Sequence, residues 1–118
     1  QKLFLSGKLP NPQPDGLYKG LVGFKTSWQG KKFNASNSTG MNIIENKEKY
    51  PFKTYIGNGL ADKELTVFKI DYNLHQNPFW LKFIVDEIVE SSPNLFLGKV
   101  HINFFGFPFS LSYFRLEK

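Results

Sequence analysis

Residues 65–72 read LTVFKIDY, a segment in which side-chain character alternates along the chain. In an extended chain, the even positions from Thr66 to Tyr72 fall on one face and the odd positions from Leu65 to Asp71 on the other. A period of two, carried by β-branched and aromatic residues, is typical of a strand that turns one face to a core. The segment therefore predicts a β-strand.

Segments of the same kind recur on both sides of it, separated by runs of Gly, Asn, Pro and Ser. The other predicted strands cover residues 17–33, interrupted by Gly20, Gly23 and Gly30, and then residues 41–45, 50–56, 79–90, 95–105 and 109–116. Glycine inside a strand pattern marks a bulge or a tight bend, and we expect Gly98 to be another bulge. This spacing predicts an all-β fold, a single antiparallel β-barrel or strongly curved sheet of about eight strands, calycin-like in outline.

The length of 118 residues suits one domain. We expect a barrel over residues 17–118, preceded by an extended, proline-rich arm over residues 1–16. Leu3 to Leu5 would form an edge strand or a docking arm. Pro10, Pro12 and Pro14 favour an extended path, and Asp15-Gly16 a turn.

Residues 79–90, FWLKFIVDEIVE, are compatible with two structures. As a strand, Phe79, Leu81, Phe83 and Val85 would share a face, whereas a helix would group Phe79 with Phe83 and Ile84. The β-branched residues favour the strand, and we predict it.

Charge and composition disfavour several kinds of partner. The net charge is +5, but the lysines are scattered and there is a single arginine, Arg115, so a nucleic-acid interface is not expected. No apolar run is long enough for a transmembrane helix. The absence of cysteine slightly favours a cytoplasmic location. Because the chain begins at Gln1, an upstream signal or anchor stays an alternative.

Catalytic and cofactor motifs are not apparent. The chain has no Walker-type glycine loop, no HExxH and no GxSxG. The two histidines, His75 and His101, are far apart in sequence and indicate no metal site. We therefore expect neither a metal nor a cofactor, and we favour a binding role over catalysis.

Asp86 and Glu87 are adjacent charges in an otherwise apolar predicted strand. Neighbouring strand residues point to opposite faces, so the two cannot form an acid–base couple, and one of them should point inward. A carboxylate in an apolar interior needs a base as partner. The candidates are Lys31, Lys69, Lys82, Lys99 and Arg115. The inward carboxylate would then be a structural ion pair or an anchor for a ligand head group.

Aromatic residues make up 17% of the chain, and thirteen are phenylalanine. Core packing explains most of them, but an eight-stranded barrel can also hold one small ligand. The candidate ligand-binding residues are Trp28, Tyr72, Trp80, Asp86, Glu87, His101 and Tyr113.

Residues 104–109 read FFGFPF and are too uniformly apolar to face one core by alternation. At least one ring should point outward, at a barrel mouth, a dimer contact or a partner surface. The candidate partner contacts are Phe104, Phe105, Phe107 and Phe109.

Several short elements occur in a characteristic order. They are Trp28-x-Gly30-Lys31-x-Phe33, Asp86-Glu87-x-Val89, Leu97-Gly98-Lys99 and Tyr113-Phe114-x-Leu116. In this order, across residues 25–116, the chain resembles small uncharacterised bacterial β-barrel domains of the GXWXG/DUF4334 type, which are lipocalin-like in outline. The resemblance implies a barrel fold and assigns no activity.

Three functions follow as hypotheses. The first is a non-catalytic binding domain for a small hydrophobic or amphipathic molecule, such as a fatty acid or isoprenoid. The second is a structural or interaction subunit, a homo-oligomer or part of a larger, membrane-associated complex. The third is a cofactor-free enzyme that uses Asp86 or Glu87 with His101 or a tyrosine. The direction in which the apolar residues point distinguishes the first two.

Overall fold

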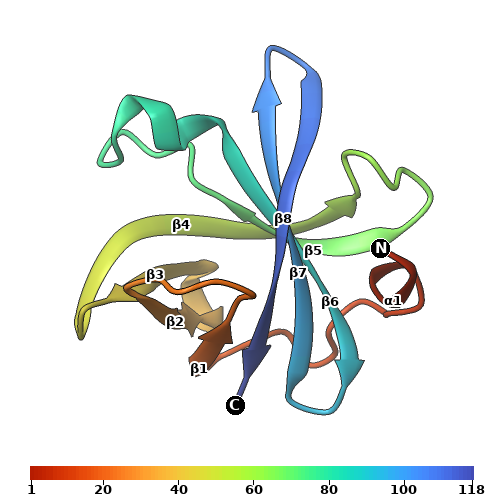
Figure 1. The fold of residues 1–118 in the computed structure, drawn as a ribbon, viewed down its shortest axis with the longest axis horizontal. Coiled ribbons are helices and arrows are strands. Elements are labelled where there is room, and N and C mark those ends of the chain that lie inside the picture. The colour runs from red at the N-terminus through yellow and green to blue at the C-terminus, as the bar shows by residue number, and fades with distance from the viewer.

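The computed structural model describes all 118 residues and confirms the all-β prediction. Eight antiparallel strands follow one another around a closed barrel (Figure 1). The strands are β1 (Gly16–Leu21), β2 (Trp28–Asn34), β3 (Thr39–Ile44), β4 (Lys47–Asn58), β5 (Thr66–Asp71), β6 (Ile84–Ser92), β7 (Leu95–Phe104) and β8 (Phe107–Glu117). The barrel closes where β8 pairs with β1, from Lys19 opposite Glu117 to Leu21 opposite Arg115. None of the helices in this fold has the length and apolar character that a bilayer-spanning helix needs.

The sequence predicts an extended N-terminal arm, but the arm is not extended throughout. Lys2–Leu5 form a single helical turn, α1, in place of an edge strand. Phe4 of this turn is buried against Val67 and Val89 on the outer surface of the barrel, so the segment docks on the wall. The proline-rich stretch then continues to the start of β1, with Leu9 packed on the barrel core and Pro14 fully buried.

The strand prediction for residues 79–90 is correct only from Ile84 onward. Phe79–Phe83 form a 3₁₀ helix, η2, which follows Pro78. The preceding loop is fixed by Asn77, whose amide donates to the carbonyl groups of Pro51 and Tyr72. This wide connection replaces a continuous strand, and it leaves Phe79 and Trp80 exposed at the surface.

The glycines serve two different purposes. Gly30 marks a true irregularity, because the register of β2 against β3 shifts between Trp28 and Gly30. The prediction of a bulge at Gly98 is wrong, since this residue pairs regularly with Ile88 and Phe114. A Cβ at Gly98 would lie 2.1 Å from the ring of Phe114, so the glycine makes room for that ring.

The barrel interior is filled at one end by aromatic and aliphatic side chains. Tyr18, Phe33, Phe52, Phe68, Phe96 and Leu116 belong to one buried cluster. Neighbouring rings meet edge to face, as Tyr18 and Phe33 do with centroids 5.7 Å apart. The opposite end, where the β1–β2 loop, the β3–β4 turn and η2 lie, is not filled in this way.

Candidate functional site

A cavity of about 250 Å³ occupies the unfilled end of the barrel. Its lining is mainly apolar and comes from almost every part of the barrel wall. Among the lining residues are Phe24, Trp28, Ile44, Leu81, Val100 and Phe114. Phe24 lies in the β1–β2 loop and Leu81 in η2, so both connections contribute to the lining of the cavity.

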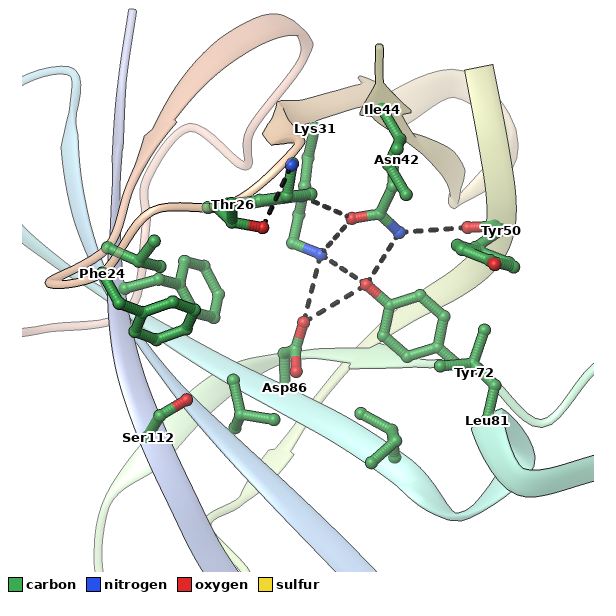
Figure 2. Close-up of a pocket in the computed structure, with 15 residues that line it drawn as sticks. Phe24, Thr26, Lys31, Asn42, Ile44, Tyr50, Tyr72, Leu81, Asp86 and Ser112 are labelled. Atoms are coloured by element: carbon green, nitrogen blue, oxygen red, sulfur yellow. Dashed lines mark hydrogen bonds and ion pairs between the residues drawn. The ribbon is translucent and has the colours of Figure 1, made fainter. Parts of the chain in front are cut away.

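Four polar side chains meet at the cavity wall, and we call them the polar cluster: Lys31, Asn42, Tyr72 and Asp86 (Figure 2). Strand register brings them together. Lys31 on β2 lies directly opposite Asn42 on β3, and Asp86 on β6 lies between Ile70 and Val100. Tyr72 follows the last residue of β5 on the inward face. All four side chains are buried.

Lys31 is the centre of the polar cluster. Its ammonium nitrogen is 3.1 Å from Asp86 Oδ2 and donates to Asn42 Oδ1 over 2.8 Å. It also donates to the hydroxyl of Tyr72. Of the five bases that the sequence offers as partners for the inward carboxylate, the barrel geometry selects Lys31.

Asn42 and Tyr72 complete the network. Asn42 Oδ1 also accepts from Trp28 Nε1 over 2.9 Å, and its amide donates to the Tyr50 carbonyl and to the Tyr72 hydroxyl. Because Trp28 and Lys31 can only donate, the orientation of the Asn42 amide is fixed. The Tyr72 hydroxyl in turn donates a hydrogen bond to Asp86 Oδ2 over 3.3 Å.

Burial perturbs the titration of two members of the cluster. Desolvation lowers the pKa of Lys31, and the negative charge of Asp86 opposes this shift. Desolvation, with a further contribution from Asp86, raises the pKa of Tyr72 well above its ordinary value. Tyr72 therefore keeps its proton, and its hydroxyl remains a hydrogen-bond donor to Asp86.

Aromatic rings surround the Lys31 ammonium group. Its nitrogen is 5.6 Å from the ring centroid of Trp28, 5.1 Å from that of Tyr72 and 5.5 Å from that of Phe114. At this range the electron-rich faces of the rings attract the cation. The aromatic content noted in the sequence thus helps to hold a charged group inside the barrel.

No family model, curated protein or solved structure matches this chain.

The residues proposed from sequence separate into two groups. Trp28, Tyr72 and Asp86 meet at the cavity. Trp80 lies outside it, exposed on η2, with its ring centroid 6.2 Å from that of Tyr50. Glu87, as expected from alternation, points away from Asp86 to the outer face of the wall.

The outer face carries a second buried group of charges. Glu87 Oε2 lies 3.2 Å from Lys69 Nζ and accepts from the Leu60 backbone N–H over 2.8 Å. His101 is fully buried beside it, with Nδ1 3.9 Å from Glu87 Oε1. The barrel wall separates His101 from Asp86, so His101 and Asp86 do not form a common site. The structure has no group of three acidic or histidine side chains able to hold a metal ion.

Tyr113 belongs to the attachment of the N-terminal arm. Its hydroxyl donates to Gln1 Oε1 over 2.6 Å, and the same oxygen accepts from Lys99 over 2.6 Å. Lys99 also pairs with Asp62 at 2.9 Å. These contacts place Tyr113 on the outside of the barrel, away from the cavity.

The most important residue missed from sequence is Asn42. It lies in a predicted strand, residues 41–45, as a polar position between apolar ones. The signal was a shared face with Ile44, which lines the cavity. Recognising it required the register that places Asn42 opposite Lys31.

All four phenylalanines proposed as partner contacts are exposed. The exposed fractions of Phe104, Phe105, Phe107 and Phe109 are 47%, 77%, 70% and 59%. Phe104 and Phe105 also pack against Phe83, at ring-centroid distances of 5.1 Å and 6.1 Å. We call Phe79, Phe83, Phe104 and Phe105 the phenylalanine surface; it joins η2 to the β7–β8 hairpin.

His101 predicts a pH dependence of stability. Burial lowers the pKa of His101 in the folded protein, and the neighbouring Glu87 carboxylate opposes the shift without reversing it. In the unfolded chain the group keeps an ordinary pKa of about 6.5, so the unfolded state binds the proton more readily. We expect the free energy of unfolding to fall as the pH drops below about 6.5, by at most about 1.4 kcal/mol per pH unit from this group.

Urea unfolding of wild type and His101→Leu across this pH range measures the effect. The variant should lack the part of the slope that arises from His101. His75→Leu is the matched control, because His75 is exposed, and it should keep the wild-type dependence. Equal slopes in wild type and His101→Leu would contradict the assignment.

Proposed function

We propose that this protein is a non-catalytic binding domain for a small hydrophobic or amphipathic molecule. The observation that supports this function is the mainly apolar cavity with four buried polar side chains on its wall, inside a barrel that is otherwise well filled. Eight-stranded barrels are wide enough to hold one small ligand, as lipocalins do.

The volume of the cavity limits the size of the ligand. A cavity of roughly 150 Å³ lined by apolar side chains stays dry and binds benzene. By proportion, about 250 Å³ accommodates on the order of ten non-hydrogen atoms. A short alkyl chain or a monoterpene-sized molecule fits this space, whereas a long-chain fatty acid would have to extend out of the opening.

The chain contains a well-placed position for blocking the cavity. Ser112 on β8 lines it, opposite Val100. We expect Ser112→Phe to place a ring in the cavity and to weaken the binding of naphthalene, an apolar molecule of suitable size, at least tenfold. Quenching of tryptophan fluorescence measures this binding, because Trp28 lies in the cavity wall.

Ser110→Phe is the matched control, because Ser110 is exposed two residues earlier on the same strand and does not line the cavity. It should bind naphthalene as wild type does. If wild type binds no naphthalene, the binding function is refuted.

The second candidate function is an interaction subunit, and the phenylalanine surface is the observation that favours it. Exposed apolar rings that contact one another are uncommon on a monomer surface and mark an interface. The naphthalene experiment also separates this alternative. If Ser112→Phe leaves naphthalene binding unchanged, the probe binds outside the cavity, and the phenylalanine surface becomes the leading site.

A further inference from the structure

We propose that the cavity selects ligands whose polar end is a neutral hydroxyl, which donates its hydrogen bond to Asp86. The inference rests on the proposed binding function and deepens it by assigning the chemical class of the head group. It follows from a count of donors and acceptors in the polar cluster (Figure 2).

The donors of the polar cluster are already in use. A lysine ammonium group has three N–H donors, and those of Lys31 go to Asp86, Asn42 and Tyr72. The amide of Asn42 has two, which go to the Tyr50 carbonyl and to Tyr72. The one hydrogen of the Tyr72 hydroxyl goes to Asp86. The Trp28 indole N–H goes to Asn42.

One strong acceptor in the cluster is left without a partner. Asp86 Oδ2 pairs with the Lys31 ammonium group and accepts a hydrogen bond from the Tyr72 hydroxyl. Asp86 Oδ1, in contrast, is buried and has no hydrogen-bond partner. A buried carboxylate oxygen without a donor carries a large desolvation cost. A ligand O–H that reaches Oδ1 would remove that cost, and the surrounding apolar lining would hold the rest of the molecule.

A carboxylate ligand does not meet these requirements. The positive charge of Lys31 is neutralised by Asp86 at 3.1 Å, so the site offers no net positive charge to an incoming anion. A ligand carboxylate would also bring its oxygens toward Asp86 Oδ1, where like charges repel. The other hydroxyl-bearing side chains on the lining, Thr26, Tyr50 and Ser112, carry one neutral hydroxyl each. The cavity is therefore expected to discriminate against fatty acids.

Three probes, each with an eight-carbon chain, separate these head groups: octanol, octyl methyl ether and octanoate. The ether retains the oxygen of the alcohol but has no O–H to donate. Isothermal titration calorimetry of wild type is expected to show octanol binding about tenfold or more tightly than either of the others, as for a hydrogen bond to a charged acceptor.

The Asp86→Asn variant tests the same inference through a change of preference. It removes the negative charge and leaves Lys31 as an unpaired cation beside the cavity. The affinity for octanoate should therefore rise relative to the affinity for octanol. Circular dichroism establishes that the variant is folded. If it is not, the comparison of the three probes on wild type still decides.

The outcomes test hydroxyl selection and the binding function separately. If octanol, the ether and octanoate bind wild type equally, or if octanoate binds most tightly, hydroxyl selection is wrong while the binding function stands. If none of them binds and naphthalene does not bind either, both are refuted. Tight octanol binding, together with a shift toward octanoate in Asp86→Asn, supports hydroxyl selection.

Discussion

Replacing Lys31 by methionine is expected to lower the free energy of unfolding by about 3–5 kcal/mol, because it leaves a buried carboxylate without its counter-charge. In the wild type the two side chains are 3% and 5% exposed and lie 3.1 Å apart. Methionine retains much of the apolar length of lysine, so lost packing contributes little. Equilibrium urea unfolding, followed by circular dichroism, measures the change.

Two further variants isolate the cause. Lys32→Met removes the neighbouring lysine, which pairs with Glu48 at the exposed surface, and it should change stability by no more than about 1 kcal/mol. The double variant Lys31→Met with Asp86→Leu removes both buried charges and should recover much of the loss. A double variant as unstable as Lys31→Met would show that the charge is not the reason.

Gly30→Ala is expected to destabilise the barrel by at least about 3 kcal/mol, or to prevent folding. Gly30 has φ +149°, in a region that residues with a Cβ rarely adopt, and an added Cβ would lie 2.0 Å from the Tyr18 carbonyl oxygen. The backbone of β1 itself occupies the space, so no side-chain rotation can relieve the clash. Thermal and urea unfolding of the purified variant measure the loss.

Gly23→Ala is the matched control for the same substitution in the same part of the chain. No atom lies within 4 Å of a Cβ built at Gly23. Its stability should differ from wild type by about 0.5 kcal/mol or less. A stable Gly30→Ala protein with the wild-type fold would contradict the geometry described for β2.

The sequence predicted the strands well where their pattern depends on the faces of the sheet. Phe68 and Ile70 point inward, and Val67 and Lys69 point outward, as the alternation of residues 65–72 requires. The prediction failed at Phe79–Phe83 because a 3₁₀ turn there is stabilised by its surroundings. The side chain of Asn77, which binds the backbone of Pro51, fixes the approach to that turn, and such a distant contact leaves no local pattern.

The candidate site was only partly predictable for a related reason. Alternation alone shows that Asp86 and Glu87 lie on opposite sides of a strand, and this is what the structure has. It does not show which lysine reaches which carboxylate. Lys31 forms an ion pair with Asp86 inside the barrel, and Lys69 forms one with Glu87 on the outer face. That choice depends on the register of strands distant in sequence, which no short motif encodes.

The order of the strands also has a consequence for how the chain folds. Seven of the ladders join strands that follow one another in sequence, so each closes a short loop at small entropic cost. The eighth, between β1 and β8, joins Lys19 to Glu117, nearly the full length of the chain, through the shortest run of paired residues in the barrel. The entropic cost of ring closure is therefore concentrated in this one seam. The hydrogen bonds that Lys99 and Tyr113 donate to Gln1 add a second link between the N-terminal segment and the last two strands.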